Sequence, residues 1–131
     1  MSNVEREHHE KLVSGLYEQL KMIFESSEQP MYLYLDDNHW IANKKFLSLL
    51  EYKSMGEIIG TKQSLLDVLV DVKSQESLAT AYNNAMTKMV GSTIRVEWKK
   101  KSGTRVDSTV IIVPIVYQGH LLALHFLSPK S

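Results

Sequence analysis

Five histidines are the side chains of this chain that acid–base or metal chemistry would use first. His8 and His9 stand in a charged N-terminal stretch, where we expect both to face solvent. His39 is expected to be structural, His120 falls in a turn, and His125 lies in an apolar segment where it faces either the interior or the outside. No histidine pair has the short spacing, with a carboxylate beside it, that marks a metal site, so none is predicted.

The sequence lacks the residues and spacings that nucleophilic catalysis usually requires. The chain has no cysteine, which removes thiolate nucleophiles, thiolate metal ligands and disulfides together. It has no Gly-x-Ser-x-Gly segment, no glycine-rich phosphate loop and no paired-carboxylate signature, and Asp36 and Asp37 are better explained as turn residues. An enzyme on a similar α+β sheet would need His125 with an acidic partner, which the sequence does not identify. We therefore expect no enzymatic activity.

A basic cluster surrounds Trp98, which could serve as a stacking platform for a nucleotide. The cluster consists of Arg95, Lys99, Lys100, Lys101 and Arg105. Lysines at a hairpin tip usually solvate it and discourage edge-to-edge pairing, and a tryptophan at an alternating apolar position is more often core. The chain carries 15 basic and 15 acidic residues, so no overall field attracts nucleic acid or an anionic membrane. We expect neither as a partner.

Length and composition fit one globular domain. The chain has 131 residues, of which 44% are hydrophobic and 23% charged. Its N-terminus lacks the apolar segment of a secretory signal, and its longest apolar run, residues 110–117, is too short to span a bilayer. With no cysteine to require an oxidising compartment, we expect a cytoplasmic protein.

Hydrophobic spacing predicts the elements that must position these side chains. A helix over residues 5–26 carries apolar residues at three- and four-residue steps. Two short strands follow, at 31–35 and 39–42, and Asn43 is a good N-cap for a helix that ends near Tyr52. Short helical turns are predicted over 54–59 and 65–69.

The second half of the chain is predicted to hold one longer helix and three strands. The helix runs from Ser74, which can cap it, to Met89 and is ended by Gly91. Strands at 94–99, 106–116 and 121–127 are separated by turns at 100–104 and 118–120, and the last is apolar enough for burial on both faces. The fold class is therefore α+β, with an antiparallel sheet and helices packed on one face.

This element order, with these residues, resembles the PAS domain family over roughly residues 18–127. The markers are Pro30, Asn43 with Phe46, Leu49 to Tyr52, Glu57 to Gly60, Lys101 to Gly103, Pro114 with Ile115, and Gly119. Glu51 replaces a frequent glycine, the first hairpin has Asp36-Asp37-Asn38 instead of its usual glycine, and the Asp-Ile-Thr ending is absent. The resemblance implies a five-stranded antiparallel sheet whose helical side encloses a pocket.

The same resemblance restricts the cofactor. PAS domains bind flavin, haem, small metabolites or nothing, but cysteinyl-flavin photochemistry requires a cysteine that this chain lacks. Haem-binding members usually take the axial histidine from the long helix, and residues 74–89 contain none. The cofactor is therefore left unknown, and haem is not expected.

The resemblance also suggests two sites within two segments: an N-terminal amphipathic helix over residues 1–26, for dimerisation or for capping the sheet, and a PAS domain over 27–131. The candidate ligand-binding residues are Tyr34, Ile41, Asn43, Phe46, Leu50, Leu66, Leu69, Tyr82, Met86, Trp98 and Phe126. The candidate dimerisation residues are Val13, Leu16, Tyr17, Leu20, Ile23 and Phe24. The plain alternatives are that the first set packs the core and the second covers the chain's own sheet.

The function expected from this resemblance is that of a sensory or regulatory module. A small ligand would bind between sheet and helices, and a homodimer or a protein partner such as a histidine kinase or a regulator would transmit the signal. The alternative is a PAS module that binds no ligand and acts in protein–protein interaction or dimerisation.

Overall fold

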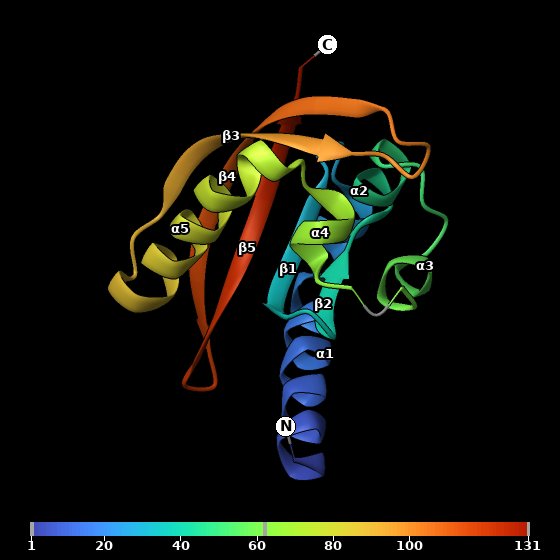
Figure 1. Ribbon diagram of the computed structural model, residues 1–131. Coiled ribbons are helices and arrows are strands. Elements are labelled where there is room, and N and C mark those ends of the chain that lie inside the picture. Colours follow the sequence, from blue (N-terminus) through green and yellow to red (C-terminus); the bar gives the residue numbers. More distant parts are fainter. Residues whose placement is uncertain (1, 62, 131) are drawn as a thin grey trace.

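The computed structural model describes residues 2–61 and 63–130, which form one antiparallel sheet with helices on both faces (Figure 1). The sheet has five strands in the order β2-β1-β5-β4-β3. In chain order the elements are α1 (Asn3–Ser26), β1 (Met31–Asp36), β2 (His39–Ala42), α2 (Lys44–Leu49), α3 (Met55–Ile59), α4 (Leu65–Leu69), α5 (Val72–Lys88), β3 (Ser92–Lys99), β4 (Arg105–Tyr117) and β5 (His120–Pro129). The predicted α+β class, the five-stranded sheet and the N-terminal helix are confirmed.

The turns between strands explain why the sheet folds in this register. Gly103 in the β3–β4 turn has a φ of 95°, a conformation that glycine adopts without steric cost. Gln118 and Gly119 between β4 and β5 have φ values of 49° and 79°, which is the pattern of a two-residue type I′ hairpin turn. In the β1–β2 turn the Asp36 carboxylate accepts a hydrogen bond from the Asn38 N–H at 2.9 Å. All three predicted turns are therefore confirmed.

The inner face of the sheet is the one covered by α2, α3, α4 and α5. Its core is dominated by aromatic residues, and Phe46 and Trp98 are completely buried there. The Trp98 indole N–H donates to Ser108 Oγ at 2.8 Å. The expectation that Trp98 is core, and not an exposed stacking platform, is confirmed.

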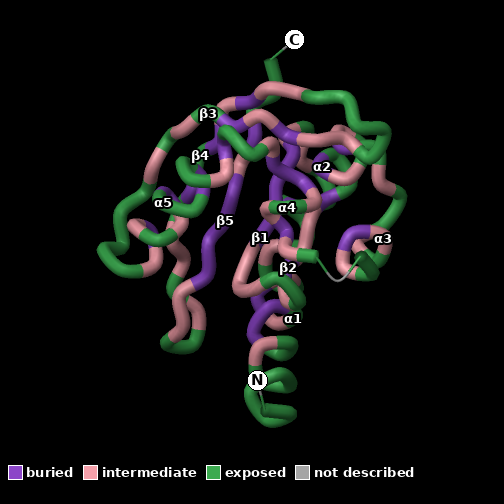
Figure 2. Tube along the Cα trace, in the orientation of Figure 1, coloured by how far each residue is buried: buried purple, intermediate pink, exposed green. Residues whose placement is uncertain are grey.

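The outer face of the sheet is covered by α1, which packs over β1, β2 and β5. Val13, Leu16 and Phe24 lie in one buried cluster with Leu33 and Leu122. The central strand β5 thus has helices on both sides, and most of its middle is buried (Figure 2). Burial of this strand on both faces was expected from its apolar sequence and is confirmed. Among the described helices, none combines the length and the apolar character needed to cross a bilayer.

The boundaries of α5 differ from the prediction. Asp71 caps the helix by accepting from the Lys73 N–H, and Ser74 lies inside the first turn, where its hydroxyl instead accepts from the Glu97 N–H at 3.0 Å. Asp71 has the non-helical backbone that an N-cap requires, with φ of −58° and ψ of 141°, and its carboxylate competes well with a hydroxyl for this role. The helix ends at Lys88, and the left-handed residue that follows it is Met89, so the helix stops before the predicted Gly91.

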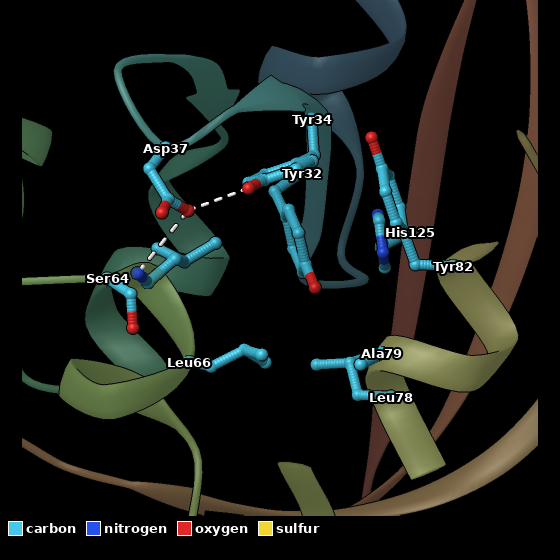
Figure 3. A pocket seen from close by; sticks show the side chains of 10 residues that line it. Tyr32, Tyr34, Asp37, Ser64, Leu66, Leu78, Ala79, Tyr82 and His125 are labelled. Carbon is cyan, nitrogen blue, oxygen red and sulfur yellow. Dashed lines mark hydrogen bonds between the residues drawn. The ribbon is translucent and has the colours of Figure 1, made fainter. Parts of the chain in front are cut away.

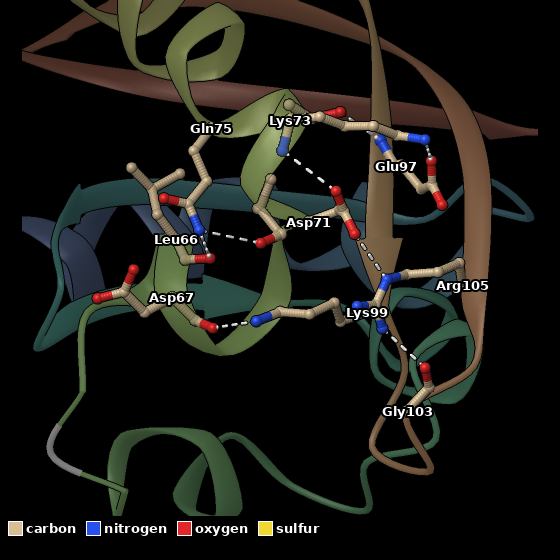
Figure 4. A network of polar contacts seen from close by, with 11 residues as sticks. Leu66, Asp67, Asp71, Lys73, Gln75, Glu97, Lys99, Gly103 and Arg105 are labelled. Carbon is tan, nitrogen blue, oxygen red and sulfur yellow. Dashed lines mark hydrogen bonds and ion pairs between the residues drawn. The ribbon is translucent and has the colours of Figure 1, made fainter.

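Several residues of the predicted basic cluster have partners on neighbouring elements (Figure 4). Arg105 pairs with Asp71 at 2.8 Å, and Lys99 donates to the backbone carbonyl of Asp67. Lys101 pairs with Glu57 at 2.5 Å. These contacts join β3 and its hairpin to α3, α4 and the start of α5. Exposed pairs of this kind contribute roughly 0–1 kcal/mol each, so they orient more than they stabilise.

Candidate functional site

A cavity of about 150 Å³ lies between the inner face of the sheet and helices α4 and α5 (Figure 3). Its lining combines four apolar side chains with six polar ones. The lining residues are Tyr32, Tyr34, Asp37, Ser64, Leu65, Leu66, Leu78, Ala79, Tyr82 and His125. Sites for drug-sized ligands usually occupy roughly 300–1,000 Å³. This cavity fits a smaller molecule, or a few waters at about 30 Å³ each.

Two of the cavity tyrosines are fixed by hydrogen bonds to the protein. The Tyr34 hydroxyl donates to Asp37 Oδ1 at 2.6 Å, and the Leu65 N–H approaches the same oxygen at 3.4 Å. The Tyr82 hydroxyl donates to the Leu35 carbonyl at 3.4 Å. Burial, followed by the hydrogen bond to Asp37, raises the pKa of Tyr34. Both phenols are neutral at physiological pH and act as rigid walls, with rings edge-to-face at 5.3 Å.

Tyr32 is different, because its hydroxyl points into the space between Leu66 and Ala79 (Figure 3). The residue is 2% exposed, and within the described part of the chain no hydrogen bond reaches its hydroxyl. Burial raises the pKa of Tyr32 well above its usual range, so the hydroxyl keeps its proton. The hydroxyl oxygen keeps some exposure to the cavity, so water there can satisfy it. An occupant with one polar atom would take the place of that water at the hydroxyl.

His125 forms the wall beside Tyr32. It is 2% exposed, and burial lowers its pKa to about 3, although hydrogen bonds to the backbone of Ala123 and Tyr32 oppose the shift. The ring is therefore neutral at physiological pH. Its Nδ1 lies 3.2 Å from the Ala123 carbonyl, which can only accept, so Nδ1 carries the proton and Nε2 is left as an acceptor. The sequence left open whether His125 faces the interior or the outside, and in the structure it faces the interior.

The predicted ligand-binding residues divide into four groups in the structure. Tyr34, Leu66 and Tyr82 line the cavity. The side chains that pack the inner core without lining this cavity are Phe46, Leu50, Leu69, Met86 and Trp98. Asn43 is a structural cap, which accepts from the N–H groups of Met31 and Phe46 and donates to the Gln29 carbonyl.

Ile41 and Phe126, the remaining two, require a correction. Both belong to the outer cluster beneath α1, so they face away from the cavity. Side chains alternate along a strand, and the inward positions are held by their neighbours Trp40 and His125. The prediction chose the wrong member of each adjacent pair of large side chains.

The predicted ligand-binding set also left out part of the lining, which consists of Tyr32, Asp37, Ser64, Leu65, Leu78, Ala79 and His125. Of these, only His125 had been considered, as a residue that faces either the interior or the outside. Alternation would have found Tyr32, because it lies two positions before Tyr34 and shares its face of β1. Asp37 and Ser64 carry no such signal. They reach the cavity only because the β1–β2 turn lies against the start of α4.

The predicted dimerisation residues lie along α1. Val13, Leu16 and Phe24 are buried against the sheet of the same chain, and Tyr17 and Leu20 are partly buried there. Ile23 is 57% exposed, and its neighbour Met22 is 84% exposed. A contact with a second protomer stays a prediction, and in this arrangement the exposed pair would provide it.

No protein-family model and no curated protein matched the chain. Solved structures do match. A PAS domain from a two-component sensor histidine kinase has a TM-score of 0.64 and 15% identity, covering 89% of this chain and 99% of that one. The PAS domain of a protein from Colwellia psychrerythraea gives 0.69 and 19%, covering 88% and 97%. The LOV protein of Rhodobacter sphaeroides gives 0.71 and 14%, covering 90% and 68%. With its sheet order and its inner cavity, the chain thus has the fold of a PAS domain.

Proposed function

We propose that the protein is a cytoplasmic, non-enzymatic sensory module that binds a small, mostly apolar molecule in the inner cavity. The observation that carries the proposal is the Tyr32 hydroxyl, which points into this cavity and has no hydrogen-bond partner in the described chain. The four apolar residues of the lining suit an aliphatic or small aromatic body, and Tyr32 suits one polar atom of the ligand.

Signalling would follow from a shift in population. A ligand changes a conformational equilibrium only by the difference in its affinity for the two states. The cavity is bounded by β1 and β5 on one side and by α4 and α5 on the other, so an occupant sets the spacing between sheet and helices. A second protomer or a signalling protein, such as a histidine kinase, would detect that spacing.

A second candidate is an interaction module that binds no ligand, and an exposed strip on the outer face of the sheet favours it. Ile111 and Val113 of β4 are 40% and 36% exposed. They lie outside the buried cluster that α1 covers. This strip, with Met22 and Ile23 of α1, offers apolar surface that a second protomer would bury.

The deciding experiment compares wild-type protein with two cavity variants. Native and denaturing mass spectra detect a co-purified ligand, and a fragment screen by NMR finds binders if none is retained. We expect Tyr32→Phe to weaken binding by about fivefold through loss of one hydrogen bond. Ala79→Leu should abolish binding by filling the cavity.

The control is the matched change Tyr52→Phe, since Tyr52 does not line the cavity. Binding that tolerates both cavity variants would place the ligand elsewhere. If no ligand is retained and no fragment binds, the interaction module is the better function.

A further inference from the structure

Four of the five histidines gather at one end of the molecule, where α1 passes the β1–β2 and β4–β5 turns. His8 Nε2 lies 2.8 Å from His120 Nε2, and the ring centroids of His8 and His9 are 6.4 Å apart. The ring of His9 is in turn 5.7 Å from that of His39. None of this is visible in the sequence, because the four residues come from three separate regions of the chain.

Within this group, His9, Asp36 and His39 direct their ligand atoms toward one point. His9 Nδ1 is 2.8 Å from Asp36 Oδ2, and His39 Nδ1 is 2.7 Å from Asp36 Oδ1. All three ligand atoms lie within 4.8 Å of one another. In tetrahedral zinc sites, bonds of about 2.0–2.1 Å place the ligand atoms about 3.4 Å apart. Small side-chain rotations would therefore open this triad around an ion.

We propose that His9, Asp36 and His39 form a binding site for one Zn²⁺ ion, with water as the fourth ligand. Two imidazole nitrogens and one carboxylate oxygen are a ligand set that suits Zn²⁺, whereas Mg²⁺ and Ca²⁺ need mostly oxygen donors, of which this set offers only the carboxylate. The site is independent of the inner cavity, so either proposal can fail without the other.

The surroundings of the triad support a built site. The side chains of His9, Asp36 and His39 are 26%, 26% and 10% exposed, so they are largely shielded but still reachable from solvent. The Asn38 N–H also donates to Asp36 Oδ1 at 2.9 Å, which orients the carboxylate in the way that outer partners orient metal ligands.

Zinc at this position would join α1 to the β1–β2 turn. His9 is supplied by the helix, while Asp36 and His39 flank the turn of the hairpin. The first turns of α1 project beyond the sheet (Figure 1), and zinc would fasten them there. The ion would thus control how firmly the helix on the outer face is held.

The test is calorimetric titration of ZnCl₂ into metal-free wild-type protein from which any polyhistidine tag has been removed. We expect one saturable site, with a Kd at or below about 10 μM, and no binding of Mg²⁺ or Ca²⁺. His9→Gln and Asp36→Asn should each weaken binding at least about tenfold. The double variant His8→Gln/His120→Gln is the matched control, and its affinity should stay within about threefold of wild type.

A second measurement keeps the test independent of folding in the variants. In wild-type protein, Zn²⁺ should shift the ring nitrogen NMR signals of His9 and His39 and slow amide exchange in the first turns of α1. The proposal is overturned if Zn²⁺ gives no saturable binding up to about 1 mM. It is also overturned if the His8/His120 variant loses as much affinity as His9→Gln.

Discussion

The rings of Tyr32 and His125 are stacked, with their centroids 4.0 Å apart and their planes inclined by 11°. The two residues are directly paired across β1 and β5, so the stack is a cross-strand pair on the inner face of the sheet. The stack places Tyr32, whose hydroxyl points into the cavity, directly beside a histidine that burial keeps neutral.

Acid should destabilise the protein through His125. In the folded state, burial lowers the pKa of His125 to about 3, whereas in the unfolded chain this histidine has its ordinary pKa of 6.5. The unfolded state therefore binds more protons between these values, and stability is lost as pH falls through this window, by up to about 1.4 kcal/mol per pH unit. Urea denaturation of wild type and His125→Gln from pH 7 to 4 measures this, and equal slopes would contradict it.

Replacing Asn43 should be costly, because one side chain satisfies three backbone groups. Its Oδ1 accepts from the N–H groups of Met31 and Phe46 at 3.1 and 3.0 Å, and its Nδ2 donates to the Gln29 carbonyl at 2.9 Å. We expect Asn43→Ala to lose about 2–4 kcal/mol of unfolding free energy, more than an ordinary cap. Asn43→Asp keeps both acceptor bonds and should lose less. Chemical denaturation measures both, and equal losses would show that the acceptor bonds contribute little.

Gly15 and Tyr117 should be energetically coupled. A Cβ at Gly15 would lie 2.6 Å from the Tyr117 hydroxyl but 3.4 Å from the ring carbon that carries it. In wild type, Gly15→Ala gains about 1 kcal/mol of helix propensity but must displace that hydroxyl, so we expect little net change. In a Tyr117→Phe background the gain should appear in full. A double-mutant cycle by thermal or urea unfolding measures the coupling, and strict additivity would rule it out.

Two substitutions in α1 separate sheet coverage from dimerisation. Leu16 is buried against the sheet, so Leu16→Ala should lose about 2–4 kcal/mol of unfolding free energy. Ile23 is exposed, so Ile23→Asp should lower monomer stability by no more than about 1 kcal/mol, chiefly because a carboxylate is unfavourable in the last turn of a helix. Sedimentation should show weaker self-association for Ile23→Asp. A dimer that tolerates this variant would exclude this part of α1 from the interface.

The helices, strands and turns were predictable because local sequence patterns determine them, whereas the residues that line the cavity were only partly predictable. Asn43 followed by Phe46 identifies a capped helix, and Gly103 identifies a hairpin turn; both signals lie within a few residues of the feature. The faces of Ile41 and Phe126 depend on strand register, which a shift of one residue reverses. His9 and His39 lie close together because of the path that α1 takes across the sheet, and no local sequence pattern indicates that path.

The alternation of side chains along β1 and β5 has a consequence for how this protein can change over evolution. Tyr32 and His125 face the cavity, while their neighbours Leu33 and Leu124 face α1. The residues that line the cavity and those that hold the helix are therefore separate sets within the same strands. Substitutions can adapt the chemistry of the cavity while the surface that supports α1 is inherited unchanged.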